Sequence, residues 1–408
     1  MSLVVQKYGG TSVGDASRIR SVAGRVAARR RSGDSIVVIV SAMGHTTDEL
    51  IRLSSEVSPH HHPREMDMLL TAGERISMAL LAMAIRDEGI EAVSLTGSQA
   101  GILTDTSHGH AKIREIKPSR VVEGLDLGKV VIVAGFQGVS PDTKEITTLG
   151  RGGSDATAVA MAAALGADAC EIYTDVDGVF TSDPRTVPDA KKLDEVSYDE
   201  MLEMAGAGAR VLMPRSVEFG KRFNVPIHVR SSFHDRPGTW VKEDVMEEAI
   251  VSGVIHDVSE AKITMRGVPD TPGAAAAVFT PLADAGVSVD IIVQNVSSGG
   301  VVDISFTIPR ELLIQASAIA REVANAIGAA GVDVDGTIGR VSIVGSGMRS
   351  YPGVAAKMFS VLAAADIRIA MISTSAIRVS CVIAESAVED AVRLLHAAFD
   401  PPMTEMVS

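Results

Sequence analysis

The sequence predicts an α/β protein in which a mostly parallel sheet, sandwiched by helices, is followed by two smaller βαββαβ modules. Two observations lead to this fold class. Continuous apolar runs rich in β-branched residues alternate with helical patterns in the first part of the chain, which is typical of strands buried on both faces of a sheet. In the second part, a strand–helix pattern occurs twice at a constant offset, which indicates an internal repeat.

The elements of the first part follow from these runs. Strands are expected over 3–9, 35–42, 91–97, 129–136 and 169–175. Helices are predicted over 15–31, beginning at Asp15, over 64–87, and over the Ala-rich stretch 153–166. Ligands of such sheets lie beyond the carboxyl ends of the strands. A functional site is therefore expected in the turns that follow these strands.

The repeat begins after residues 237–249, where the character of the chain changes. Pro272-Gly273 matches Pro352-Gly353 at an offset of 80 residues. Phe279, Leu282 and Val289 match Phe359, Leu362 and Ile369 at the same offset. Each copy reads as strand, turn, helix and strand, followed by another strand and a helix. Because neither copy gathers Lys, His or acidic residues at its turns, the repeat favours a binding or assembly module over a duplicated catalytic domain.

Composition narrows the class of protein. The chain has 408 residues, 46% hydrophobic and only 3% aromatic, so its core must consist mainly of aliphatic side chains. A net charge of −13 argues against nucleic acid or anionic membranes as partners, since both require dense Lys and Arg. Cys170 and Cys381 lie far apart in apolar stretches, which favours buried thiols of a reducing compartment. Without a signal-peptide pattern or an apolar run of about 18 residues, a cytoplasmic protein that does not span a membrane is expected.

The stretch QKYGGTSVGD at residues 6–15 is the first candidate for chemistry. Lys7 ends an apolar strand, and Gly9-Gly10 would let the backbone turn sharply and expose its N–H groups to an anion. The helix that follows would direct its positive end to the same place. A simple turn at the end of a strand is the alternative.

TTLGRGGSDATA at residues 147–158 is a stronger signal. Arg151 stands among glycines, which suits a guanidinium presented to a ligand carboxylate. Ser154 and Asp155 open the following helix, and either could be merely its N-cap.

Three further segments could contribute. Asp175, Asp177 and Asp183 follow a strand and could help to hold Mg²⁺ beside phosphates, or they could belong to structural turns. Glu74 could bind a substrate ammonium, or Glu74 and Arg75 could belong to a buried or interfacial ion pair. Ser41, Thr46 and Thr47 lie in an expected ligand loop, and residues 60–62, three consecutive histidines, are expected in a surface loop.

Together these segments resemble the monofunctional aspartate kinases of the amino acid kinase superfamily, which carry C-terminal ACT domains. The matching motifs occur in order along nearly the whole chain. They are KYGGTS, VSAMG, LLTAGERIS, TGSQAG, VAGFQG, TTLGRGGSD, EIYTDVDGV, NVPIHVRSS, HDVSEAKIT, QNVS, SYPGVAAKMFS and MISTS. The resemblance implies ATP-dependent phosphorylation of the side-chain carboxylate of L-aspartate to 4-phospho-L-aspartate, with Mg²⁺ as cofactor.

The resemblance also implies site residues. Lys7 would neutralise charge on the transferred phosphoryl group, and Asp155 would orient Lys7 or help to place Mg²⁺. Residues implied for aspartate are Thr47, Glu74, Arg151, Gly152, Gly153 and Ser154. Residues implied for the nucleotide are Lys7, Tyr8, Gly9, Gly10, Ser41, Thr174, Asp175, Phe180, Arg185, Arg210 and Val211. No dedicated protein metal site is expected.

The repeat corresponds to the two regulatory ACT domains of the resembling family, with threonine or lysine, or both, as expected effectors. The implied inhibitor pocket contains Asp270, Gly273, Ala275, Gln294 and Ser297. The expected domains are a catalytic domain at 1–246, an inserted ACT domain at 262–337, and a second ACT domain built from 247–261 and 338–408. An oligomer is expected, either of identical chains or with a separate regulatory subunit whose internal start would be Met246.

Two other functions are compatible with parts of this pattern. A glutamate 5-kinase would use an acceptor one methylene longer, but its regulatory appendage differs from two ACT modules. A non-catalytic amino-acid sensor could keep the same fold, but the presence of Lys7, Glu74, Arg151 and Asp155 argues against it.

Overall fold

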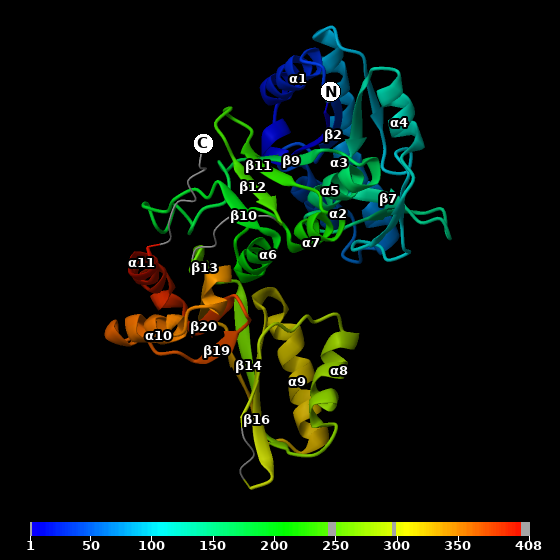
Figure 1. Ribbon diagram of the computed structural model, residues 1–408. Coiled ribbons are helices and arrows are strands. Elements are labelled where there is room, and N and C mark those ends of the chain that lie inside the picture. Colours follow the sequence, from blue (N-terminus) through cyan, green and yellow to red (C-terminus); the bar gives the residue numbers. More distant parts are fainter. Residues whose placement is uncertain (1, 244–249, 296–298, 401–408) are drawn as a thin grey trace.

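The computed structural model describes residues 2–243, 250–295 and 299–400 (Figure 1). Its largest element is an eight-stranded sheet in the order β10-β12-β11-β9-β1-β2-β6-β3. The strands are β1 (Leu3–Tyr8), β2 (Ser35–Val40), β3 (Ala92–Leu95), β6 (Val130–Ala134), β9 (Ala169–Thr174), β10 (Glu195–Ser197), β11 (Ile227–Ser231) and β12 (Thr239–Lys242). All neighbouring strands are parallel except β11 and β12. The five strands expected from the apolar runs are β1, β2, β3, β6 and β9, each within two residues of its predicted bounds.

Helices cover both faces of this sheet, as predicted. The helices of this part are α1 (Ala16–Arg31), α2 (Thr46–Val57), α3 (Pro63–Asp87), α4 (Ser119–Asp126), α5 (Gly153–Leu165), α6 (Tyr198–Ala207) and α7 (Pro214–Phe223). Side chains alternate along β2, so that Ile36 and Val38 pack with α1 and α3 while Val37 and Ile39 pack with α5. Both faces are thus apolar, which explains why the strands read as continuous hydrophobic runs.

A second, four-stranded sheet was not expected from the sequence. It has the order β5-β4-β7-β8 and consists of β4 (Ile102–Thr104), β5 (Ile113–Ile116), β7 (Gln137–Val139) and β8 (Ile146–Thr148). Its strands have only three or four residues, too short to produce a recognisable alternation. The sheet matters for function because β8 leads directly into the GRGGSD segment.

Helix α3 is long and apolar enough to meet the length and composition of a membrane-spanning helix. It packs against α1, α2 and β8, and 39% of its most apolar stretch is buried. Its buried positions include the polar residues Asp67, Thr71, Glu74 and Ser77. Polar side chains buried on a helix need polar partners in the protein around them.

The C-terminal part forms two units with the same architecture. The first contains β14 (Glu260–Pro269), α8 (Ala274–Asp284), β15 (Ile292–Gln294), β16 (Val301–Pro309), α9 (Leu313–Ile327) and β17 (Gly331–Asp335). The second contains β13 (Gly253–Asp257), β18 (Ile338–Val344), α10 (Val354–Ala364), β19 (Met371–Thr374), β20 (Arg378–Ala384) and α11 (Val388–Phe399). Their sheets have the orders β15-β16-β14-β17 and β13-β18-β20-β19.

The repeat seen in the sequence is visible in these units. Gly273 and Gly353 precede α8 and α10 with φ of 96° and 99°, and Leu282 and Leu362 are buried in the two cores. The units differ in one strand. In the second unit the place of β17 is taken by β13, which pairs with β18 although it precedes the whole first unit in the chain. The first unit is therefore inserted between β13 and the remainder of the second.

Helix α6 joins the large sheet to the second unit, as Figure 1 shows. The Glu200 carboxylate accepts hydrogen bonds from the backbone N–H of Ser346 at 3.1 Å and from its hydroxyl at 2.8 Å. One turn on, Glu203 lies 3.0 Å from Arg378 of β20. The carbonyl of Gly206 accepts a hydrogen bond of 2.7 Å from Arg340 of β18. The polar face of α6 is thus occupied by the second unit.

Candidate active site

Lys7 and Asp155 form a close ion pair at the carboxyl edge of the large sheet. Lys7 lies at the end of β1 and Asp155 in the first turn of α5. Lys7 Nζ is 2.6 Å from Asp155 Oδ1, and each side chain is 11% exposed. The sequence placed these residues in separate motifs, and the fold brings them together because α5 packs against β1. The result is one oriented ammonium group where parallel sheets bind ligands.

Gly10 is required by the close approach of two loops. Gly9 has a φ of −69°, which lies outside the left-handed region. A Cβ on Gly10 would lie 2.9 Å from the carbonyl oxygen of Ala42, and Gly44 N donates to the Gly10 carbonyl at 3.0 Å. The Ser41 backbone N–H donates to Tyr8 at 3.1 Å. The loops after β1 and β2 therefore form one continuous surface beside Lys7.

The expectation that α1 directs its N-terminus to an anion is not supported. A short 3₁₀ helix, Gly10–Val13, separates Lys7 from α1. The α1 N-terminus is capped by its own Asp15, whose carboxylate accepts from Arg18 N at 2.9 Å. This confirms Asp15 as the start of the helix and removes one of the free N–H groups that an anion would need.

The GRGGSD segment ends in helix α5, but its cap differs from both residues considered. Gly152 is the N-cap, with a φ of 73°, so that Ser154 and Asp155 lie within the first turn. Both are buried, whereas Arg151 is exposed. Neither Ser154 nor Asp155 is used as a cap, which leaves their side chains available to face the sheet edge.

Glu74 of α3 is a buried carboxylate with one unpartnered oxygen. It is 4% exposed, and Oε1 accepts from the backbone N–H of Ala42 at 3.1 Å, while Oε2 has no partner. Burial raises the pKa of Glu74 to about 7. Within the chain Glu74 forms no ion pair with Arg75, since adjacent helix positions face different directions and the only partner of the Glu74 carboxylate among the described residues is Ala42 N. An open carboxylate oxygen of this kind can accept a cationic N–H group.

The substrate loop expected at Ser41, Thr46 and Thr47 is only partly a loop. Thr46 begins α2, and Thr47 lies in its first turn followed by Asp48 and Glu49. Acidic residues in this position favour a helix N-terminus, a signal that the small residues before it obscured.

The residues expected around the nucleotide fall into two groups. Thr174 ends β9 and is adjacent to the Lys7 loop, because Gly9 N donates to the carbonyl of Tyr173 at 3.3 Å. Thr174 also donates from its hydroxyl to Asp175 at 3.1 Å. The other group consists of Phe180, Arg185, Arg210 and Val211.

This second group lies toward the C-terminal units. Phe180 pairs with Lys192 in an isolated bridge, and Val211 is half-buried against the core. The exposed Arg185 lies 2.7 Å from Asp183 and lowers the pKa of that carboxyl. Arg210 is exposed, and its guanidinium is 3.9 Å from Asp257 of β13.

The three carboxylates after β9 do not form a metal cluster. Asp177 lies 2.7 Å from His234, Asp183 is paired with Arg185, and Asp175 accepts from Thr174. Among the described residues, no group of three or more potential ligands is arranged to hold a metal ion. The triple histidine at 60–62 is exposed, as expected for a surface loop.

The expected inhibitor residues lie on the first C-terminal unit. Asp270, Gly273 and Ala275 are exposed around the start of α8, and Gln294 is exposed at the end of β15. Ser297 and Met246 lie outside the described residues. β15 is an edge strand of its sheet.

Three residues beside the site were not predicted from the sequence: Asp67, Thr148 and Arg215. Asp67 is fully buried on α3 and accepts a hydrogen bond of 2.5 Å from Thr148. Arg215 of α7 donates to the carbonyl of Leu149 at 3.1 Å. A signal for Asp67 was present, because an Asp stands within the apolar run EMDMLLTAGE, seven residues before Glu74 and on the same helix face.

Comparisons with known proteins agree with this arrangement. Residues 2–231 match the amino acid kinase family, and residues 263–328 and 341–399 each match an ACT domain. The chain is 57% identical over 405 residues to an aspartokinase of Mycolicibacterium smegmatis, covering 98% of this chain and 96% of that protein. Two crystal structures of E. coli aspartokinase III are also similar at 26% identity. The complex with aspartate and ADP, described as the R-state, has a TM-score of 0.81 and covers 97% of this chain and 99% of that one. The complex with lysine and aspartate, described as the T-state, has a TM-score of 0.76 over the same shares.

Proposed function

The chain belongs to the aspartokinase family, and from this premise we propose how its residues carry out and regulate the family reaction. The enzyme transfers the γ-phosphoryl group of ATP to the side-chain carboxylate of L-aspartate, giving 4-phospho-L-aspartate and ADP. This is the first step toward lysine, threonine and methionine, and amino acids regulate it through the ACT domains. One carboxylate oxygen forms a bond to the γ-phosphorus while the bond from phosphorus to the β–γ bridging oxygen breaks.

The observation that supports the catalytic assignment is the Lys7–Asp155 ion pair at the sheet edge. Phosphoryl transfer needs positioning and charge stabilisation rather than a covalent catalyst. The ammonium group of Lys7 stabilises negative charge on the transferred group, and Asp155 holds that ammonium group in one orientation. The acceptor is already an anion, so no strong base is required to activate it.

The aspartate pocket is proposed on both sides of this pair. The open oxygen of Glu74 accepts the substrate ammonium, and the exposed guanidinium of Arg151 pairs with a substrate carboxylate. Thr47, Gly152, Gly153 and Ser154 complete the pocket.

The nucleotide is proposed to lie along the loops after β1, β2 and β9. The residues assigned to it are Lys7, Tyr8, Gly9, Gly10, Ser41, Thr174, Asp175, Phe180, Arg185, Arg210 and Val211. Because the described residues form no carboxylate cluster, Mg²⁺ is proposed to arrive with ATP, held mainly by phosphate oxygens and water. The ion would neutralise phosphate charge during transfer.

Regulation and assembly are proposed at the C-terminal units. Threonine or lysine, or both, would bind the first ACT domain at Asp270, Gly273, Ala275, Gln294 and Ser297. The exposed edge strand β15 suits pairing with another subunit, either an identical chain or a shorter regulatory one. We further propose cytoplasmic location and the domain bounds 1–246, 262–337, and 247–261 with 338–408.

Lys7→Ala tests the catalytic assignment. The variant is expected to lower kcat by at least ~100-fold, since it removes one charge-stabilising group from the transferred phosphoryl. Formation of aspartyl hydroxamate from ATP, aspartate and hydroxylamine measures the rate, with glutamate as the competing acceptor.

Lys221→Ala is the matched control, because it breaks a Lys–Asp pair of the same 2.6 Å length at the surface and is expected to leave the rate unchanged. Near-normal activity of Lys7→Ala would refute the role of Lys7. Hydroxamate formed from glutamate in preference to aspartate would refute the proposed acceptor pocket.

A further inference from the structure

We propose that Asp67 is a positioning residue that fixes the substrate loop, residues 149–152, and thereby sets the place of Arg151. This inference rests on the proposed function, in which Arg151 pairs with a carboxylate of aspartate. Asp67 itself does not touch substrate. It acts through Thr148 and through the adjoining loop, residues 105–111.

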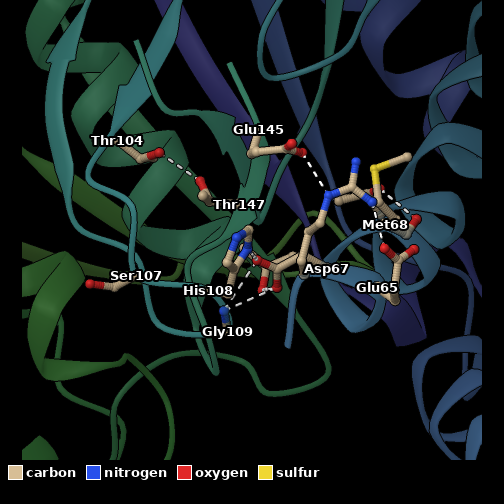
Figure 2. Close-up of polar contacts among 12 residues, drawn as sticks. Glu65, Asp67, Met68, Thr104, Ser107, His108, Gly109, Glu145 and Thr147 are labelled. Atoms are coloured by element: carbon tan, nitrogen blue, oxygen red, sulfur yellow. Dashed lines mark hydrogen bonds and ion pairs between the residues drawn. The ribbon is translucent and has the colours of Figure 1, made fainter. Parts of the chain in front are cut away.

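The Asp67 carboxylate has several hydrogen-bond partners (Figure 2). Asp67 Oδ2 is 2.6 Å from Nδ1 of His108. Asp67 Oδ1 accepts from the backbone N–H of Gly109 at 3.0 Å and from the hydroxyl of Thr148 at 2.5 Å. Asp67 is fully buried. Since an ionised carboxylate only accepts hydrogen bonds, three donors from two segments are held at one point on α3.

These contacts reach Arg151 through a short stretch of backbone. Thr148 is the last residue of β8, two residues before Gly150 and three before Arg151. Gly150 packs against the neighbouring loop so closely that a Cβ there would lie 3.0 Å from the carbonyl oxygen of Gly109. A shift of Gly109 or Thr148 is therefore transmitted to the residue next to Arg151.

A second charged side chain also contacts both of these loops. Arg215 of α7 donates to the carbonyl of Leu149 at 3.1 Å and to the carbonyl of Ala111 at 3.0 Å. The Ala111 backbone N–H in turn donates to the Thr148 carbonyl at 2.8 Å. The main chain before Arg151 is thus held by Asp67, through Thr148, and by Arg215, while the Arg151 side chain is exposed.

Helix α3 carries both Asp67 and Glu74, the residue proposed to bind the substrate ammonium. Asp67 and Glu74 are seven residues apart, which is two helical turns and about 10 Å along one face. Glu74 is proposed to bind the ammonium of aspartate, and Asp67 sets the loop that binds a carboxylate. The groups proposed to bind the ammonium and a carboxylate of aspartate are then both positioned by α3. Loss of Asp67 therefore weakens aspartate binding and leaves ATP binding intact.

A contact between α3 and the β7–β8 hairpin does not by itself require a buried carboxylate, because a second ion pair also joins them. Arg64, at the start of α3, lies 2.9 Å from Glu145 of the turn between β7 and β8, and both side chains are partly exposed. It joins the same helix to the same hairpin without touching loop 149–152. Glu145→Gln is therefore a matched control for the loss of a contact between these elements.

The test is a double-variant cycle in the full-length enzyme, with steady-state constants for aspartate and ATP. Asp67→Asn keeps the shape but places an N–H group against one of the three donors. It is expected to raise the aspartate KM about tenfold and to change the ATP KM less than about twofold. Glu145→Gln is expected to leave both constants unchanged.

In an Arg151→Ala background, Asp67→Asn is expected to raise the aspartate KM further by less than about twofold, because the group that it positions is gone. The same tenfold increase in both backgrounds would overturn the positioning role. An unchanged aspartate KM in Arg151→Ala alone would instead refute the proposed pocket, and the positioning role would fall with it.

Thr148→Val provides a second variant that removes one donor without adding a polar group. It is expected to raise the aspartate KM about threefold, again only while Arg151 is present. Should Asp67→Asn not fold, this variant decides the question, and an unchanged aspartate KM in Thr148→Val overturns the proposal.

Discussion

Glu74 shows how much the environment of one residue adds to its identity. In the sequence TAGERIS, Glu74 was compatible with a substrate-binding residue or with a member of an ion pair. In the fold it is buried on α3, satisfied at one oxygen by Ala42 N and unpartnered at the other. Removal from water disfavours the charged form, so its pKa is raised from 4.5 to about 7.

The raised pKa makes Glu74 a source of pH-dependent instability in the enzyme without substrate. Between about pH 4.5 and pH 7, Glu74 holds a proton in the folded state that it has released in the unfolded chain. The contribution of Glu74 to the free energy of unfolding therefore falls as pH rises. Glu74→Gln lacks this titration. It is expected to be more stable than the parent by on the order of 3 kcal/mol at pH 8, with the difference vanishing near pH 4.5.

Urea unfolding of both proteins at pH 5 and pH 8, without aspartate, measures this difference. Comparing the two proteins cancels the titration of Glu260, whose pKa burial also raises to about 7. A stability difference that is the same at both pH values would contradict the expectation.

Helix α5 is flanked at both ends by a glycine with positive φ. It begins after Gly152 and ends before Gly166, with φ of 73° and 63° respectively, a conformation that residues other than glycine adopt with strain. The two glycines differ in their surroundings. A Cβ on Gly152 would lie 2.1 Å from Cγ of Met213, whereas nothing lies within 4 Å of a Cβ on Gly166.

Gly166→Ala is expected to lower the free energy of unfolding by about 1 kcal/mol from backbone strain alone, without changing the kinetics. Gly152→Ala adds a steric conflict that displaces either Met213 or the loop that carries Arg151. It is expected to be less stable than Gly166→Ala and to raise the aspartate KM at least about tenfold. Urea unfolding and steady-state assays compare the two, and identical behaviour would show that Met213 yields without moving the loop.

Elements were predicted well where burial on both faces made the strand pattern continuous. β1, β2, β6 and β9 follow from such runs, and α3 and α5 from their length and composition. The sheet of β4, β5, β7 and β8 was missed because its strands are too short for periodicity. The start of α2 was missed because the small residues before it suggested a loop.

At the scale of the whole molecule, Arg340 connects all three parts of the chain. It lies on β18 of the second ACT unit and is 1% exposed. It pairs with Glu260 of the first unit at 3.0 Å and with Asp290, and it donates to the carbonyl of Gly206 in the kinase domain at 2.7 Å. A single buried guanidinium thus satisfies groups from the three parts.

Arg340→Ala is expected to lower the free energy of unfolding by about 3 kcal/mol, because it leaves the buried Glu260 without its cation. The control is Glu385→Gln, which breaks the more exposed pair with Arg310 between the two ACT units and is expected to cost less than about 1 kcal/mol. Urea unfolding of both variants gives the comparison. Equal effects would mean that Arg340 contributes no more than a surface ion pair.

The second ACT unit also touches the loop proposed to border the nucleotide. The Thr181 carbonyl accepts from Val254 N of β13 at 2.7 Å, and its hydroxyl lies 2.9 Å from His396 of α11. Together with the contacts of α6, this places the regulatory part against two segments of the kinase domain. The contacts of Arg340 and of these segments join residues at least 50 positions apart, so no local pattern could have indicated them.

The sequence by itself determined the fold class, the internal repeat and the motifs of the site, because burial periodicity and turn chemistry are local properties. It also determined the family, because motifs such as KYGGTS and TTLGRGGSD are specific in type and spacing. Only the tertiary structure decided which groups meet. Lys7 meets Asp155, Thr148 meets Asp67 across 81 positions, and β13 completes a sheet whose other strands follow an entire inserted unit. Such pairings depend on the packing of distant segments, where distance, burial and the number of available donors settle what each side chain can do.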